Sequence, residues 1–188
     1  MNTKANKDNP RGLSPVELGI AVVVLALVLG FLWMRYSELQ KEARIAQLQV
    51  ARGNVLSAHL LVYATVLMKN EVPDASPCTG TVVVADNAQG AQGSVCTTRG
   101  VVHLAHGYPL ASPLDGPPGI LVAAGFFQGE DGGERELAAQ GIRYEAAGGK
   151  AIFVGTGASD PKKCNFEYTQ SPGSRIPAVV GGLKISGC

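Results

Sequence analysis

The sequence has almost no net charge and few aromatic residues. Its 188 residues include 16 Lys and Arg against 15 Asp and Glu, and aromatic side chains make up 6%. Nucleic-acid-binding proteins commonly carry a basic patch, and no such patch with interleaved aromatics is present, so we expect no nucleic-acid partner. A chain of this length fits one membrane span and one soluble domain with a single core.

Signatures of catalysis are also absent. The sequence has no G-x-S-x-G, no H-E-x-x-H and no P-loop. Of its three histidines, His103 and His106 have an odd spacing, which on a strand directs side chains to opposite faces. His59 is expected to pack on a helix or at its rim. We therefore predict no enzyme active site, no metal site and no cofactor.

One long apolar run lies near the N-terminus. Between Leu13 and Met34 the only charged residue is Glu17, and the run reaches the roughly 20 residues that a helix needs to cross a bilayer. The preceding residues 1–12 carry more basic than acidic side chains. Because cytoplasmic flanks are enriched in Lys and Arg, we predict a single span with its N-terminus in the cytoplasm and the rest of the chain outside.

The cleavage site of an ordinary signal peptide is missing. Such a site follows the apolar core with a small-residue pattern, but here the core continues directly into Met34-Arg35-Tyr36-Ser37. The remaining candidate for processing is Gly12, ahead of the core. Cleavage there would leave the whole apolar helix on the mature protein.

Four cysteines, all located after the span, indicate disulfides. Exported chains meet an oxidising compartment, and four cysteines allow three connectivities. The spacing favours two local loops, and no C-x-x-C pair supports a zinc site instead. The favoured pairs are Cys78 with Cys96 and Cys164 with Cys188.

The segment after the span is predicted to continue the helix. Between Ser37 and Met68 there is no proline and a single glycine, Gly53. Apolar positions recur at spacings of three and four, which is typical of an amphipathic helix. The predicted apolar stripe is Leu48, Ala51, Val55, Ala58, Val62 and Thr65, and the predicted wet side is Lys41, Glu42, Arg44, Gln47 and Arg52.

Beyond Glu71 the sequence changes to short β-type runs separated by Gly, Pro, Asn and Asp. We predict one antiparallel sheet with strands at Thr81–Ala85, Val101–Ala105, Ile142–Glu145, Ala151–Val154, Phe166–Thr169 and Ala178–Ile185. A short helix is predicted at Ile120–Phe127 and an exposed loop at Gly129–Arg135.

Several stretches together resemble one family. Arg11-Gly12 followed by Leu13-Ser14-Pro15-Val16-Glu17 and the apolar run resembles the class III leader and N-terminal helix of type IV prepilins and pseudopilins. The stretches SELQKEARIAQLQ, LLVYA, HGYPLAS and the terminal CNFEYTQ…SGC are similar to the mannose-sensitive haemagglutinin branch of pilins. The resemblance covers most of the chain.

The resemblance implies an α+β fold. A long N-terminal α-helix, hydrophobic in its first half and amphipathic in its second, would pack on a C-terminal antiparallel β-sheet. The implied organisation is a leader at 1–12, a transmembrane or filament-core helix at 13–36, an amphipathic helix half at 37–70 and a globular head with disulfides at 71–188.

The resemblance also implies a life cycle. A prepilin peptidase would cut between Gly12 and Leu13 and methylate the new amine of Leu13. The single-pass precursor would wait in the inner membrane until an assembly platform lifts it into an extracellular helical homopolymer. In that fibre Glu17 would face the terminal amine of a neighbouring subunit. Adhesion or biofilm formation is the expected role.

Glu17 also has a local interpretation. Ser14-Pro15-Val16-Glu17 fits a capping box, with proline in the first helical position. Capping is worth about 1 kcal/mol, whereas a carboxylate at membrane depth costs up to roughly 3 kcal/mol on insertion scales. The imbalance favours a partner charge, although the two roles are compatible.

Two other functions remain open. A pseudopilin of a type II secretion system resembles a pilin at the helix but typically has an acidic calcium site near its C-terminus, where only Asp160 and Glu167 are found here. A bitopic membrane protein with a periplasmic binding domain would keep its leader and remain a monomer.

Overall fold

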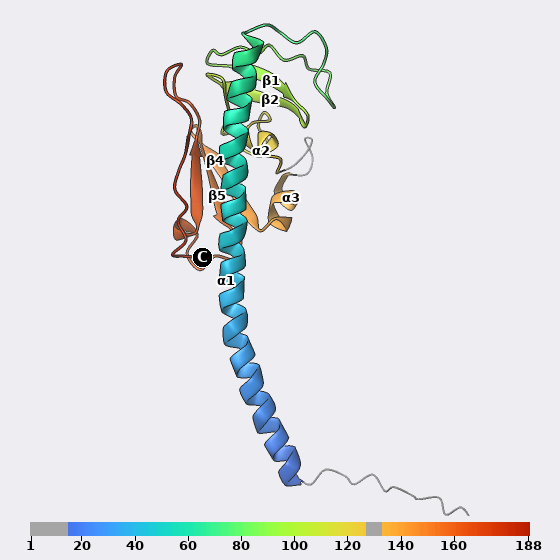
Figure 1. The fold of residues 1–188 in the computed structure, drawn as a ribbon, viewed down its shortest axis with the longest axis vertical. Coiled ribbons are helices and arrows are strands. Elements are labelled where there is room, and N and C mark those ends of the chain that lie inside the picture. The colour runs from blue at the N-terminus through green and yellow to red at the C-terminus, as the bar shows by residue number, and fades with distance from the viewer. Residues whose placement is uncertain (1–14, 127–132) are drawn as a thin grey trace, which may run out of the picture. The chain divides into compact units, whose positions relative to one another are not determined.

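The computed structural model describes residues 15–126 and 133–188, the side chain of Met34 excepted. It contains two compact units, Met1–Gln40 and Lys41–Cys188, and we call the second the globular unit. Figure 1 shows one long helix together with antiparallel sheets. The predicted α+β class with a long N-terminal helix is confirmed.

Helix α1 spans Pro15–Lys69. Pro15 occupies the first helical position, where its missing N–H costs nothing. No further proline follows until Pro73, which accounts for the helix length. The helix ends where Asn70 and Glu71 adopt left-handed backbone conformations, with φ of 48° and 59°.

The buried stripe of α1 in the globular unit follows the predicted spacing. Thr65 differs from the prediction, since it is half-buried and donates its hydroxyl to the Leu61 carbonyl, while Val66 is fully buried. Arg44 and Arg52, predicted for the wet side, are half-buried as well. The buried apolar positions are Leu48, Ala51, Val55, Ala58, Val62 and Val66.

The strands form two antiparallel sheets rather than the single predicted sheet. The first has the order β1-β2-β3 and the second the order β4-β5-β6-β7. Proline cannot donate a ladder hydrogen bond, so Pro109 ends the first sheet and the prolines that follow keep the next segment out of either. The strands are β1 (Gly93–Thr97), β2 (Gly100–Ala105), β3 (Tyr108–Pro109), β4 (Ile142–Ala147), β5 (Lys150–Gly155), β6 (Asn165–Thr169) and β7 (Val179–Val180).

The predicted strands have mixed outcomes. Those at Val101–Ala105, Ile142–Glu145, Ala151–Val154 and Phe166–Thr169 lie within β2, β4, β5 and β6 and are confirmed.

The strand predicted at Thr81–Ala85 is wrong. The Cys78 amide donates to the Val83 carbonyl, which folds this segment into a loop with its valines exposed. The strand predicted at Ala178–Ile185 shortens to β7 and one isolated bridge, between Asn165 and Lys184.

The short helices also differ from prediction. Helix α2 covers only Ile120–Ala123, and Phe127 lies outside the described residues. The predicted loop Gly129–Arg135 is wrong where it is described, because Gly133–Ala139 forms α3. Acidic side chains in its first turn favour a helix start, and its own residue Leu137 is buried. A 3₁₀ turn, η1, spans Pro161–Lys163.

An aromatic cluster fills the core beside the second sheet. Phe153 stacks on Phe166, its partner across the β5–β6 pair, with ring centroids 4.6 Å apart, and meets Tyr144 edge-on at 5.1 Å. Leu48 and Val55 of α1 belong to the same cluster. Further along α1, Val62 and Val66 pack instead with residues of β1 and β2. One helix therefore covers both sheets.

Two buried tyrosines tie the second sheet to the last strand of the first sheet and to the segment that follows it. The Tyr168 hydroxyl donates to the Pro109 carbonyl and the Tyr144 hydroxyl to the Ser112 carbonyl, each at 2.7 Å. Burial raises the pKa of both phenols, and for Tyr168 the proximity of Tyr144 raises it further. The folded state therefore holds both hydroxyls in the neutral, donating form.

These tyrosines predict alkaline unfolding. Because their pKa values are raised in the folded state, their contribution to stability is complete below about pH 10, the ordinary tyrosine pKa, and is lost as the pH rises further. Tyr144→Phe should lower the free energy of unfolding by about 1–3 kcal/mol at neutral pH, because the Ser112 carbonyl loses its donor. The variant should also lose less of its free energy of unfolding above pH 10 than the wild type does. Urea unfolding between pH 7 and 11 measures both effects.

The matched control is Tyr36→Phe, since Tyr36 is exposed on α1. It should reproduce the wild-type curve. If the free energy of unfolding of Tyr144→Phe fell as steeply above pH 10 as that of the wild type, the role assigned to the Tyr144 hydroxyl would be contradicted.

Candidate functional site

The first described residue is Pro15. The predicted leader 1–12, the cleavage pair Gly12 and Leu13, the N-methylation site at Leu13 and the capping residue Ser14 therefore lie outside the described residues.

Glu17 lies in the first turn of α1, where a carboxylate interacts favourably with the positive end of the helix dipole. Its side chain is exposed. The residues that share its helical face are all apolar, at the spacings that place side chains on one side of a helix. They are Ile20, Ala21, Val24, Leu25 and Val28. In the described part of α1, Glu17 is thus an acidic residue at the start of an apolar face.

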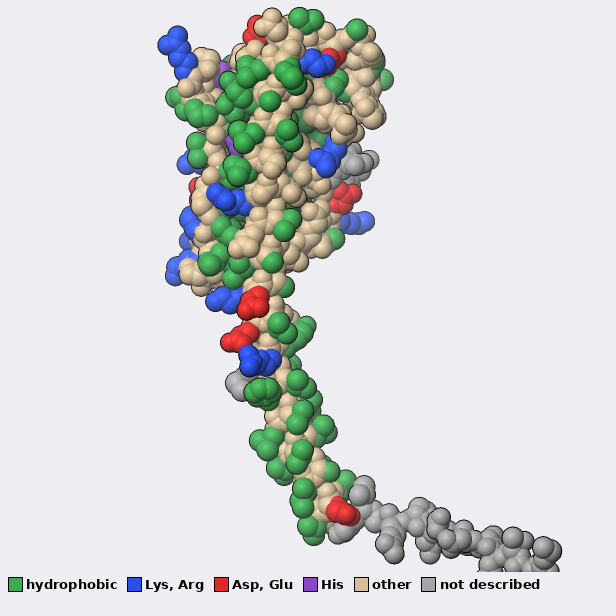
Figure 2. Space-filling view, in the orientation of Figure 1, with side chains coloured by type: hydrophobic (Ala, Val, Ile, Leu, Met, Phe, Trp, Pro, Cys, Tyr) green, Lys and Arg blue, Asp and Glu red, His purple; other side chains and the backbone are tan. Residues whose placement is uncertain are grey.

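The apolar surface of this segment is extensive. Every side chain from Pro15 to Trp33 is exposed, and the exposed fractions of Val16 and Trp33 reach 70% and 78%. Figure 2 shows hydrophobic side chains along the segment. Soluble monomers rarely expose contiguous apolar patches of more than a few hundred Å². Among the described residues, α1 is the helix that is long and apolar enough to cross a membrane.

Both disulfides have the favoured pairing, which is confirmed. Cys164 pairs with Cys188, and Cys78 pairs with Cys96 of β1. No cysteine is left free.

The C-terminus is fixed to α1 by contacts that the sequence reasoning missed. Arg44 Nη1 donates to the Cys188 carbonyl oxygen and Arg52 Nε to the Gly181 carbonyl oxygen, both at 2.8 Å. The two arginines are eight residues apart with buried Leu48 midway between them, so they flank the apolar stripe. That spacing is the signal that could have identified them.

The three histidines are separated in the structure. His59 is buried, with Nδ1 3.1 Å from the Val55 carbonyl oxygen, and lies near the rings of Tyr108 and Tyr168. His103 is on β2, whereas His106 is in the following turn with φ of 52°. His103 and His106 line two different recesses. Within residues 15–126 and 133–188, no group of three His, Cys, Asp or Glu side chains is placed to hold a metal ion.

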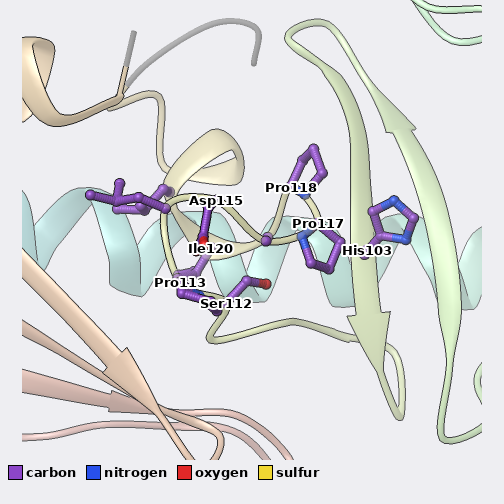
Figure 3. Close-up of a pocket in the computed structure, with 11 residues that line it drawn as sticks. His103, Ser112, Pro113, Asp115, Pro117, Pro118 and Ile120 are labelled. Carbon is purple, nitrogen blue, oxygen red and sulfur yellow. The ribbon is translucent and has the colours of Figure 1, made fainter. Parts of the chain in front are cut away.

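Figure 3 shows the recess that His103 lines, with a volume of about 340 Å³. The proline-rich segment Pro113–Ile120 forms most of its wall, and Asp115 belongs to that segment. The Ser112 hydroxyl is buried and makes no hydrogen bond within the described part of the chain.

Comparisons of the chain with protein-family models, with curated proteins and with solved structures give no match.

Removing the terminal disulfide should destabilise the globular unit. Cys164 and Cys188 are separated by 24 residues, and closing a loop of that size contributes about 3 kcal/mol in the chain-entropy model. The double variant Cys164→Ser, Cys188→Ser should lose roughly that free energy of unfolding and become sensitive to protease at residues 181–188. Limited proteolysis with urea unfolding measures both effects.

Reduction of the wild type supplies the comparison, because it opens both disulfides and should be more damaging than the double variant. Unchanged protease resistance of the double variant would show that the contacts of Arg44 and Arg52 hold the C-terminus alone.

Proposed function

We propose that this chain is a structural subunit of a type IV pilus-like surface fibre, of the mannose-sensitive haemagglutinin type, serving adhesion or biofilm formation. The observation that carries the proposal is the exposed apolar face of α1 with Glu17 in its first turn. The role is structural rather than enzymatic.

The precursor would be a single-pass inner-membrane protein. Lipid covers the apolar face, and the oxidising exterior suits the two disulfides of the globular unit. Prepilin peptidase would cleave between Gly12 and Leu13, and methylate the amine of Leu13. The product keeps its membrane helix and gains a positive charge near Glu17 in sequence.

Leaving the membrane requires a new cover for the apolar face. Other copies of the same helix supply one, since they bring an equally apolar surface. A head-to-tail contact that does not close into a ring generates a helical filament. In the filament interior the Glu17 carboxylate needs a compensating charge, and the Leu13 amine of a neighbouring copy would supply it. An assembly platform in the inner membrane would drive this transfer.

The direct test is the intact mass and N-terminal sequence of the protein from sheared surface fractions and from membranes. A chain that begins at methylated Leu13 in sheared fibres is expected. Processed protein confined to membranes would instead favour a type II secretion pseudopilin. An intact Met1 leader in all fractions would favour a bitopic membrane protein and overturn the proposal.

Replacing Glu17 tests the assembly step. Glu17→Gln should leave the amount of processed subunit in the membrane unchanged but reduce sheared fibres at least about tenfold, because about 1.4 kcal/mol lost per contact corresponds to that factor. Immunoblots of the two fractions measure both quantities.

Glu42→Gln is the matched control, an exposed glutamate on the same helix in the globular unit. It should assemble like the wild type. Normal fibres from Glu17→Gln would refute the assigned role of this carboxylate.

A further inference from the structure

A second recess lies where the C-terminal end of α1 meets three loops. Its volume is about 370 Å³, within the range of small-molecule sites. In Figure 1 the red-brown segment after β6 reaches the end of the globular unit at which α1 terminates. The side chains used below are Tyr63, Glu71, Gln89, His106, Tyr108 and Arg175, all of which line the recess.

The backbone around this recess is strained. Of the described non-glycine residues, four have positive φ, and three of these lie in or beside it: Asn70 at 48°, Glu71 at 59° and His106 at 52°. Asparagine tolerates this conformation, but it is uncommon for glutamate. Strained residues of this kind cluster at binding sites and persist only where the surroundings hold them.

The surroundings do hold them. The Glu71 carboxylate accepts a hydrogen bond from the backbone N–H of Gln89 at 3.3 Å, and the backbone N–H of His106 donates to the Gly90 carbonyl at 2.7 Å. Both strained residues are thereby tied to the same loop. These hydrogen bonds hold Glu71 and His106 in the wall of the recess.

The recess has two formal charges of opposite sign. Glu71 and Arg175 both line it, and neither belongs to any of the ion pairs found among the described residues. Arg175 is exposed in a tight turn closed by the Ile176 amide, which donates to the Gly173 carbonyl at 3.0 Å. A simple anion would meet the Glu71 carboxylate, and a simple cation would meet the Arg175 guanidinium. A ligand with both charges suits both side chains.

Aromatic rings form another wall. Tyr63 and Tyr108 stack with centroids 4.3 Å apart and planes 4° from parallel. Burial raises the pKa of Tyr108, and the neighbouring Tyr63 raises it further, so the phenol stays neutral. An aromatic ring face attracts a ligand ammonium group. The His106 Nδ1 atom is buried without a hydrogen-bond partner in the described structure.

We propose that this recess binds a zwitterionic α-amino acid with an apolar side chain. The ligand ammonium group lies against the Glu71 carboxylate and the tyrosine pair. The ligand carboxylate pairs with the Arg175 guanidinium, whose planar fork suits a carboxylate. Ile176 and Pro177, which also line the recess, contact the apolar side chain. This binding does not depend on fibre formation.

Three related probes that carry different charges test the proposal by calorimetric titration of the full chain in detergent micelles. L-phenylalanine has both charges, L-phenylalaninamide lacks the carboxylate and N-acetyl-L-phenylalanine lacks the ammonium group. We expect L-phenylalanine to bind and each analogue to bind at least about tenfold more weakly, since each loses one charge-assisted contact. Equal binding of all three, or no binding of L-phenylalanine at millimolar concentration, would overturn the proposal.

Two variants test which side chain of the recess contacts which charged group of the ligand. Arg175→Gln should abolish the preference for L-phenylalanine over its amide, and Glu71→Gln should abolish the preference over the N-acetyl analogue. Arg175 is exposed, so its replacement does not endanger folding, and thermal unfolding checks Glu71→Gln.

Arg135→Gln and Glu42→Gln make the same chemical changes at exposed positions outside the recess. Both controls should keep the wild-type preferences. Unaltered preferences in Arg175→Gln would show that the recess does not read the ligand carboxylate and would overturn the proposal.

Discussion

The buried stripe of α1 is the contact on which the globular unit depends. The two sheets share no strand, and the same helix packs Leu48 and Val55 with the second sheet and Val62 and Val66 with the first. Neither sheet can enclose a core by itself, because a sheet must bury its apolar face against another layer. The hydrogen bonds from Tyr144 and Tyr168 of the second sheet to the carbonyls of Ser112 and Pro109 then join the second sheet to the end of the first.

Sequence periodicity predicted the parts of the fold that pack on this stripe. Strand β4 alternates buried Ile142 and Tyr144 with exposed Arg143 and Glu145, and period-two patterning is a strong signal. It failed where another constraint took precedence. Val82, Val83 and Val84 have high β-propensity but lie in a loop closed by the Cys78 amide, whereas β1 contains Ser94, Cys96 and Thr97 and was not recognised. Propensity describes a residue that fits a half-buried pleated surface, and here it is β1 that obtains one, because β1 pairs with β2.

The candidate sites differ in how far a sequence can reveal them. Glu17 stands out because a charge within an apolar run is visible along the chain, and the spacing of the cysteines favours the two pairs that form. The contacts of Arg44 with Cys188 and of Arg52 with Gly181 join residues more than a hundred positions apart. The recess at the end of α1 assembles from segments equally distant, and the left-handed backbone of Glu71 and His106 leaves no signal in residue type.

The two disulfides act where backbone pairing is sparse. Residues 70–92 and 181–188 contain no named helix or strand, so few ladder hydrogen bonds offset the conformational entropy that their ordering costs. Cys78–Cys96 ties the first of these segments to β1, and Cys164–Cys188 ties the second to the start of β6. Since the Cys188 carbonyl is also the acceptor for Arg44, opening the terminal disulfide would weaken the attachment of the last residues to α1. The packing of α1 on the second sheet is therefore strengthened while the Cys164–Cys188 disulfide stays oxidised.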